Sequence, residues 1–511
     1  MKKRLLSLLG AGLLLLSLTG CWEEAPDSMN DSLLPEETAE EPIQEEPEVL
    51  LPLSFSLPYN AGQTLEPITC ADGMQQVVGA LLYEGLFQLD THLEPQPWLC
   101  SGYTYDPETF TYVFTLRSGV TFSDGSPLTA ADVTATLWRA KSSQRYGARL
   151  TRMVSASAGD GTVTVVLNSA NTGFPALLDI PIIKSGTEGD LVPVGTGPYV
   201  YAQDDGGPCL LANDSWWNGG GQPVERIGLS SAADRESMLY QFTSHDVQLI
   251  TADLTGTSPI SATGNISFQD ADTTVLQYLG LNTARAPFDN AAVRRALSRG
   301  VDRTTVVSAF MSGHAAAAQF PVSPLSPLYP ADLEQAYSYD AFVQALETAA
   351  DGQTWALTLL VNEENSFKVS SAEYLAQILS AAGMTITVEA LPWEEYTAAL
   401  AAGDFDLYYG EVKLTADWDL RPLLATDGSL NYGGWANATT DSLLAAYASA
   451  ADRTAAMRDL CSHLQQQAPV IPVCFKSTSV LMQSGVVEGL TPTMANPFHD
   501  LASCVIHLRE D

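Results

Sequence analysis

The sequence has little positive charge, because 24 Lys and Arg stand against 60 Asp and Glu and give a formal net charge of -36. A surface that binds nucleic acid is a basic patch, so this charge balance excludes a nucleic-acid partner. The chain also contains no CxxC pair, and its six His are scattered. The ligand spacing of a metal site is therefore missing, and we predict neither a metal nor another cofactor.

Common catalytic signatures are absent as well. The chain contains no GxSxG turn and no HExxH motif, which mark two large groups of hydrolases. We therefore predict that the protein is not an enzyme. The alternative is a secreted hydrolase that uses a pair of carboxylates, because such a pair leaves no local motif.

Long apolar runs are missing from all but the first residues. Residues 2–4 are cationic, residues 5–18 are almost entirely apolar, and Thr19-Gly20 resembles a small-residue cleavage site, which together indicate an export signal peptide over 1–20. This run falls short of the roughly 20 apolar residues of a membrane-spanning helix. No later run has that length, so we expect no other segment to span a bilayer.

The signal ends in Leu18-Thr19-Gly20-Cys21, which resembles the bacterial lipobox. In a lipobox the Cys is acylated and becomes the mature N-terminus, and two or three acyl chains anchor a protein more stably than one. We therefore predict lipid attachment, including palmitate, at Cys21, which would hold the protein on the outer face of the bacterial cytoplasmic membrane. The alternative is a plain secretory signal followed by an incidental Cys.

A strongly acidic segment follows Cys21. Residues 22–50 contain 11 Asp and Glu, scattered Pro, and no Lys or Arg. Such a composition does not bury enough apolar surface to order itself, and its like charges keep it extended. We predict an acidic disordered tether over 21–49. An acidic interaction tail is the alternative.

The remaining body is long enough for two or three domains with their own cores. It is acidic and contains six further cysteines. An exported chain permits disulfides, but six widely spaced cysteines allow about 15 pairings and give no framework. These cysteines are Cys70, Cys100, Cys209, Cys461, Cys474 and Cys504.

Local patterns in this body predict alternating strands and helices. Residues 112–117 have the β-branched and aromatic content of a strand, Asp124-Gly125 favours a turn, and Thr129 with Asp132 has capping-box spacing for a helix start. Residues 289–313 predict a pair of helices behind an Asn290 cap.

A strand–helix–strand unit is predicted farther along the chain. Residues 355–364 have the pattern of a buried strand, residues 370–383 that of an amphipathic helix closed by Gly383, and residues 384–391 that of a second strand. A unit of this size favours parallel pairing through a right-handed crossover. The fold class is therefore α/β.

Six blocks along the body form a recognisable series. The blocks are LYEGLFQLD (82–90), the segment 93–133, VGTGPYVY (194–201), LGLNTARAPFDNAAVRRALSRGVDR (279–303), GDFDLYYGEVKLTADWDL (403–420) and QQAPVIPV (466–473). Any one block would be weak, but in this order they cover nearly the whole mature chain. Together they make it similar to a known family, the peptide-binding branch of the extracytoplasmic solute-binding proteins of ABC importers, which is family 5 and includes oligopeptide-, dipeptide- and nickel-binding proteins.

The resemblance implies a periplasmic-binding-protein-like fold of class II, type C cluster, with two lobes, a hinge and an extra subdomain. Two crossing strands would join the lobes, and hinge closure would enclose a ligand between them. Lobe I would contain residues 50–275 and 477–511, with a subdomain at 76–190. Lobe II would contain residues 276–476. We expect a monomer that passes its solute to the transmembrane subunits of an ABC permease.

The resemblance also implies an anionic ligand-binding residue. In oligopeptide-binding relatives an Asp shortly after the FDL strand binds the α-ammonium group of the peptide, and the matching residue is Asp417. A buried ammonium group does need a counter-charge. The alternative is that Asp417 caps a helix that begins at Trp418. Glu411 is a second anionic candidate, although relatives often have a Trp near that position.

Aromatic residues near Asp417 are candidates for the side-chain pockets of the ligand. Trp418, Tyr409 and Tyr432, together with Tyr408, offer large apolar faces with a polar tip. Tyr278 matches a pocket-lining position of the family. Each of these rings would alternatively be part of the core.

A cation for the carboxylate of a peptide is harder to identify. Lys413 and Arg421 lie near Asp417 in the sequence, on a loop of unknown direction. Arg294 and Arg295 are expected to be structural and to pair with Asp289 or Asp302. The main chain of a peptide would be held largely by backbone hydrogen bonds, as an added strand is.

We expect the solute to be an oligopeptide or dipeptide. Oligosaccharides, nickel chelates and haem are the alternatives within the family, and the same cleft would also suit the sensing of a peptide pheromone. A bare metal ion is disfavoured because no His or Cys cluster is present.

Overall fold

The computed structural model describes residues 51–261 and 264–510. The predicted signal peptide 1–20, the predicted lipid-attachment residue Cys21 and the predicted tether 21–49 lie outside these residues. Among the described residues, no helix is long and apolar enough to cross a membrane.

We keep the names lobe I and lobe II for the predicted residue ranges 50–275 with 477–511 and 276–476. A four-stranded sheet in the order β1-β10-β9-β8 lies within the first of these ranges. The helix α1 (Gly73–Leu82) packs on this sheet, and its N-terminus is capped by Asp72, which accepts hydrogen bonds from two backbone N–H groups. Apolar residues of the C-terminal segment share the same core, so the two ends of the described chain fold together. The strands are β1 (Ser56–Tyr59), β8 (Tyr199–Asp204), β9 (Gly207–Ala212) and β10 (Arg226–Ser231).

A second four-stranded sheet of lobe I has the order β4-β5-β7-β6 and a separate core. The helix α2 (Ala130–Lys141) begins with the predicted capping box between Thr129 and Asp132. The predicted turn at Gly125 is confirmed by its φ of +82°, which favours glycine. The strands are β4 (Cys100–Asp106), β5 (Thr111–Leu116), β6 (Met153–Ala158) and β7 (Thr162–Leu167), and β5 confirms the predicted strand.

The predicted strand–helix–strand unit is confirmed in lobe II, where β14 (Trp355–Asn362) and β15 (Met384–Leu391) pair in parallel. The connecting helix α7 is Ser366–Leu379, so it ends before Gly383, contrary to the prediction. The physical reason is Ser380, whose hydroxyl oxygen accepts a hydrogen bond from the backbone N–H of Ile386 and starts the turn into β15.

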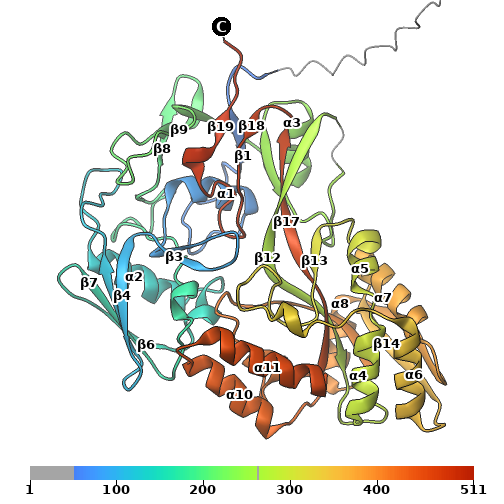
Figure 1. The fold of residues 1–511 in the computed structure, drawn as a ribbon. Coiled ribbons are helices and arrows are strands. Elements are labelled where there is room, and N and C mark those ends of the chain that lie inside the picture. The colour runs from blue at the N-terminus through green and yellow to red at the C-terminus, as the bar shows by residue number, and fades with distance from the viewer. Residues whose placement is uncertain (1–50, 262–263, 511) are drawn as a thin grey trace, which may run out of the picture. The chain divides into compact units, whose positions relative to one another are not determined.

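Helices cover the sheet of lobe II (Figure 1). The predicted cap of α4 (Ala291–Gly300) at Asn290 is confirmed. The predicted ion pairs of Arg294 and Arg295 are wrong, because both guanidinium groups donate to backbone carbonyls, chiefly of Gln467 and Gln466. The other helices are α6 (Tyr339–Ala350), α8 (Trp393–Ala402), α10 (Ala438–Ser449) and α11 (Arg453–Gln467).

The remaining elements are short. They are β2 (Phe87–Leu89), β3 (Pro95–Pro97), α3 (Arg235–Thr243), α5 (Arg303–Thr305), β13 (Ala315–Ala317), α9 (Arg421–Leu424), β18 (Val487–Glu488) and β19 (Val505–Ile506), with five 3-10 or π turns between them.

Two long antiparallel strands, β12 (Ile266–Leu281) and β17 (Val470–Gln483), pass between the lobes side by side (Figure 1). At one end β11 (Leu249–Ala252) pairs with β17, and at the other end β16 (Leu407–Lys413) pairs with β12. Their mutual pairing shifts register between Asp272 and Leu276 and again between Gln277 and Tyr278. Irregularities of this kind bend a strand pair locally, so bending is favoured near the middle of the pair.

The carboxyl group of Glu84 ties several segments of lobe I together. Three indole N–H groups donate to its oxygens, from Trp98 (2.7 Å), Trp216 (3.1 Å) and Trp217 (2.8 Å), and the hydroxyl of Thr196 donates at 2.7 Å. Burial raises the pKa of Glu84, whereas these four hydrogen bonds lower it. No ion pair involves Glu84 in the described part of the chain, so hydrogen bonds alone stabilise the buried group.

We predict that Glu84→Gln lowers the free energy of unfolding by about 1–3 kcal/mol, because an amide nitrogen replaces one acceptor oxygen and leaves two buried donors without an acceptor. Urea denaturation followed by tryptophan fluorescence measures this change. The exposed Glu225 provides the control, since Glu225→Gln should change stability by less than about 0.5 kcal/mol. An equally small effect at Glu84 would contradict the prediction.

Candidate functional site

A cavity of about 1060 Å³ lies between lobe I and lobe II. Its walls come from distant parts of the sequence: the segment around α1, the connection that follows α2, the loop after β16, and residues near the C-terminus. The crossing strands contribute Thr274 and Thr478. Because both lobes form the walls, a hinge motion at the crossing strands would change the size of this cavity.

The lobe II wall is the segment 413–416, where the chain leaves β16. Leu414 donates its backbone N–H to the carbonyl of Thr274 at 2.9 Å, and the Thr274 hydroxyl donates back to the Leu414 carbonyl at 2.6 Å. These two bonds hold the segment against the crossing strand β12. Its backbone is thereby fixed at the edge of the cavity.

Three cationic side chains line the cavity: Arg145, Arg149 and Lys413. Arg149 forms an ion pair with Asp179, which also lines the cavity. Lys413 is exposed to solvent inside the cavity, yet the walls partly desolvate it, and burial together with Arg149 and Arg145 lowers its pKa. Arg421, the other cation considered from the sequence, instead pairs with Asp419 at 2.7 Å.

Asp417 lies directly behind this wall and does not itself line the cavity. Its side chain is buried, and its carboxylate accepts hydrogen bonds from Asn171 of lobe I at 2.8 Å and from the Thr415 hydroxyl at 2.5 Å. Its backbone carbonyl accepts hydrogen bonds from Tyr447 at 2.9 Å and from Arg453 at 2.7 Å. Asp417 therefore joins the two lobes in this conformation.

The alternative role of Asp417 as a helix cap is wrong. Trp418 has a φ of +54°, which is incompatible with a right-handed helix, and α9 begins only at Arg421. The carboxylate of Asp417 accepts a longer bond of 3.4 Å from the backbone N–H of Asp419, which forms a local turn. The Trp418 ring is fully buried and packs edge-on against Phe475.

The predicted pocket aromatics lie in the cores of lobe II. Tyr409 is fully buried, and its hydroxyl donates to the side-chain oxygen of Gln277 at 2.8 Å. Tyr278 and Tyr408 are buried with their hydroxyl oxygens 3.3 Å apart. Tyr432 is half-buried and packs edge-on against Tyr408. None of these four rings lines the cavity in the described conformation.

Glu411 is on β16, two residues before Lys413, which lines the cavity. Its carboxylate accepts a hydrogen bond from the Gln277 amide at 2.9 Å and lies 3.8 Å from the ammonium group of Lys476. Lys476 is itself buried and bonds more closely to Asp253, at 2.6 Å. Glu411 thus belongs to the polar groups around the crossing strands, and it does not line the cavity.

Sequence reasoning missed most of the residues that do line the cavity. Arg145 and Arg149 follow α2 in a connection without a recognisable motif, and Glu84 and its indole partners are far apart in the sequence. Signals were present for the lining residues within the family blocks, such as Glu84 in 82–90 and Trp98 in 93–133, and for Lys413, which the sequence suggested as a cation for the ligand.

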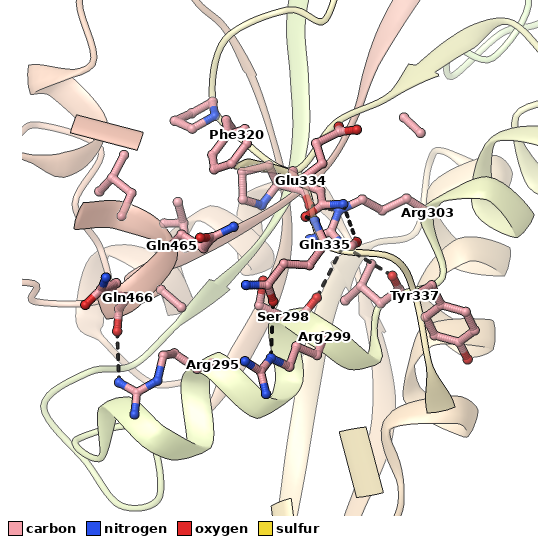
Figure 2. Close-up of a pocket in the computed structure, with 18 of the residues that line it drawn as sticks. Arg295, Ser298, Arg299, Arg303, Phe320, Glu334, Gln335, Tyr337, Gln465 and Gln466 are labelled. Atoms are coloured by element: carbon pink, nitrogen blue, oxygen red, sulfur yellow. Dashed lines mark hydrogen bonds between the residues drawn. The ribbon is translucent and has the colours of Figure 1, made fainter. Parts of the chain in front are cut away.

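A second cavity, of about 750 Å³, is formed by lobe II alone (Figure 2). Arg295 and Arg299 on one wall bond to Gln466 and Gln335. The buried guanidinium group of Arg303 donates to four backbone carbonyls, those of Ser298, Val301, Ala318 and Pro472. Arg295 and Arg303 therefore hold backbone segments together, and Arg299 contacts the Gln335 side chain.

The sequence matches a family model described as bacterial extracellular solute-binding proteins, family 5 (middle), over residues 94–429. Among curated proteins, the glutathione-binding protein GsiB of Escherichia coli K12 is 26% identical over 449 residues, which are 80% of this chain and 86% of GsiB.

Solved structures show the same fold. A nickel ABC transporter protein from Bacillus halodurans matches with a TM-score of 0.74 at 20% identity. The match covers 87% of this chain and 98% of the Bacillus halodurans chain. The oligopeptide-binding protein AppA of Bacillus subtilis, solved with a nonapeptide, has a TM-score of 0.59 at 20% identity over 90% and 100% of the two chains. The predicted α/β, periplasmic-binding-protein-like fold is thereby confirmed.

The hydrogen bond between Asn171 and Asp417 generates a prediction about stability. We expect Asn171→Ala and Asp417→Ala to be non-additive, with a coupling energy of about 0.5–3 kcal/mol, because each removes the same buried interaction. A double-mutant cycle of urea unfolding measures this coupling. The cycle of Asp417→Ala with the exposed neighbour Asn168→Ala should be additive within about 0.5 kcal/mol. Coupling of the same size in both cycles would contradict the contact.

Proposed function

Because the chain belongs to the bacterial extracellular solute-binding proteins of family 5, we propose that it captures small peptides in the cavity between its lobes. Proteins of this family are the solute-binding components of ABC importers, not enzymes, and they deliver solutes to the permease outside the cytoplasm. The peptide class of the solute, the closure mechanism and the lipid anchor are our proposals.

The observation that carries the peptide proposal is the cavity with walls from both lobes. Its volume of about 1060 Å³ is at the upper end of the range for pockets that bind small organic molecules, and it suits a short peptide better than a bare ion. Among the described residues, no group of three or more His, Cys, Asp or Glu has the geometry of a metal site. The names of GsiB and AppA, which refer to glutathione and to oligopeptides, support the same class.

Hinge closure is supported by the crossing strands. The irregular pairing between Asp272 and Leu276 lies beside the proposed boundary between lobe I (50–275 and 477–511) and lobe II (276–476). The separate core of the β4-β5-β7-β6 sheet supports a subdomain within 76–190. Closure around a ligand would bring the segment 413–416 toward α1 and would complete the enclosure of the solute.

The direct role predicted for Asp417 remains part of the proposal in a modified form. To bind the ligand, the Asp417 carboxylate would have to release the amide of Asn171 and accept a hydrogen bond from an ammonium group of the ligand. The neighbouring residues Thr415 and Ala416 line the cavity, so a ligand in contact with them would lie close to Asp417. Tyr432 is the most exposed of the predicted pocket rings, whereas Tyr278, Tyr409 and Trp418 would act by shaping the core behind the wall. Glu411 would act through the crossing strands.

We propose that the acylated Cys21 anchors a monomeric protein on the outer face of the bacterial cytoplasmic membrane and that the acidic residues 21–49 act as a tether. The support is the lipobox-like sequence Leu18-Thr19-Gly20-Cys21, followed by a segment with 11 acidic residues between 22 and 50. Repulsion among these charges would keep the lobes away from the membrane surface.

The solute class is tested by native mass spectrometry of the protein purified without refolding. We expect bound masses that correspond to short peptides at one per protein, and we expect added alanine peptides of two to five residues, or glutathione, to make the protein more compact in solution X-ray scattering. A protein that stays vacant and unchanged in size with all of these peptides would contradict the peptide proposal. Detection of a bound sugar, haem or nickel chelate would assign the solute to that class instead of to peptides.

The anchor is tested separately in the native producer. We expect Cys21→Ser to abolish the incorporation of labelled palmitate and to move the protein from the membrane fraction to the soluble fraction, because each buried methylene contributes about 0.8 kcal/mol to membrane binding. Thr38→Ala in the proposed tether should change neither measurement. Membrane association that survives Cys21→Ser would be evidence for a different anchor.

A further inference from the structure

Positive charge gathers on the cavity wall of a protein that is otherwise strongly acidic. Arg145 and Arg149 come from the connection after α2 in lobe I, and Lys413 comes from the end of β16 in lobe II. The whole chain has a formal net charge of -36. Cations from both lobes at one cavity therefore need an explanation that the mean charge does not provide.

The two arginines are held in fixed positions. Both guanidinium groups lie over the ring of Tyr146, at 5.1 Å and 5.2 Å from its centre, a favourable arrangement for a cation. One nitrogen of Arg145 also donates to the backbone carbonyls of Pro67 (3.4 Å) and Cys70 (3.2 Å). The side chain of Arg145 remains exposed to the cavity, so its other N–H groups are open to a ligand.

The acidic side chains around the cavity are already bonded to other groups. Asp179 is paired with Arg149, and Glu84 accepts hydrogen bonds from three indoles and Thr196. Asp500 is exposed and accepts a hydrogen bond from the Ser503 hydroxyl at 2.7 Å. The cavity wall also contains His499, which is adjacent to Asp500 in the sequence.

Lys413 is left without a counter-charge. Its ammonium group forms no hydrogen bond and no ion pair with any residue in the ranges 51–261 and 264–510. Arg145 and Arg149 disfavour its charged form, whereas Asp179 favours it. A partly desolvated cation with cationic neighbours is costly, and an anion that enters the cavity would relieve this cost.

We propose that Lys413 and Arg145 together bind a carboxylate group of the solute, one from each lobe, and that the protein therefore selects peptides with a free carboxylate. This inference rests on the proposed function and names its substrate class. Charge-assisted hydrogen bonds to a carboxylate are about twice as strong as neutral ones. Because the two cations are on different lobes, the carboxylate would also favour the closed arrangement of the lobes.

The ammonium end of a peptide would meet fewer charges, because Asp500 is the one lining acid among the described residues whose carboxylate is exposed, whereas the acid end would meet two cations. Asp417, the residue expected to bind it, is buried behind the wall and bonded to Asn171. The acid end of the solute should thus contribute more to affinity than the amine end, and peptides with an additional carboxylate should bind best.

The inference is tested by calorimetric titration with three probes: alanine peptides of two to five residues with a free carboxylate, the same peptides with a C-terminal amide, and citrate, a carboxylate without a peptide bond. For the unmodified protein, we expect the amides to bind at least tenfold more weakly than the free acids, which corresponds to about 1.4 kcal/mol. We expect Lys413→Gln and Arg145→Gln each to weaken binding of the acids at least tenfold and to leave binding of the amides unchanged.

The control variant is Lys184→Gln, because Lys184 pairs with Asp124 and does not line the cavity. It should bind every probe as the unmodified protein does. Unfolding curves should show that Lys413→Gln folds normally, since this side chain is exposed and forms no bonds that the fold would lose.

The outcomes separate this inference from the proposed function. Equal binding of acid and amide peptides would overturn the carboxylate inference and leave the peptide function intact. Binding of citrate alone, with its loss in Lys413→Gln, would support the carboxylate site and overturn the peptide function. If none of the three probes binds, both proposals are wrong.

Discussion

The pairing of β12 with β17 is the constraint on which the rest of this structure depends. A chain that passes between two cores must keep its backbone polar groups bonded, and two strands that bond to each other do so without help from either core. The pairing shifts register between Asp272 and Leu276 and again between Gln277 and Tyr278, and at the first shift Thr273 and Ser477 supply side-chain hydrogen bonds. The strands therefore stay paired over most of their length and are interrupted near their middle.

The cavity walls are positioned by buried polar groups rather than by apolar packing alone. Glu84 fixes one wall through three indoles, and Asp417 fixes the opposite wall through Asn171 and Thr415. Buried groups of this kind are costly unless every bond is made, so each wall is held in a single arrangement. Under the proposed hinge closure, walls of this type would confine the motion to the hinge and would leave the surfaces that contact the solute undeformed.

Local elements followed from the sequence where a cap or a strand pattern determines them. Thr129 with Asp132, Asn290 and the parallel unit around α7 are examples. The family blocks also predicted the fold class. The position of side chains relative to the cavity did not follow, because alternate residues of a strand face opposite sides. Tyr408 and Tyr409, which are adjacent on β16, lie in two different cores, and neither lines the cavity. Lys413 ends β16 and lines the cavity, whereas Asp417, in the loop that follows, lies behind the wall. No sequence pattern predicts this difference.

The net charge of the chain does not indicate the charge of the cavity wall. Acidic residues far exceed basic ones in the whole chain, yet the described wall exposes Lys413 and Arg145. Mean charge reflects the solvated surface, where acidic residues favour solubility, whereas a binding site depends on the few charges that the fold leaves unpaired. An acidic surface also repels anions at long range, and salt screens this repulsion beyond about 10 Å. An anionic solute would thus be attracted only near the cavity, where the local cations are closer to it than the surrounding acids are. Its association rate should therefore rise with ionic strength until salt also screens the cations of the cavity.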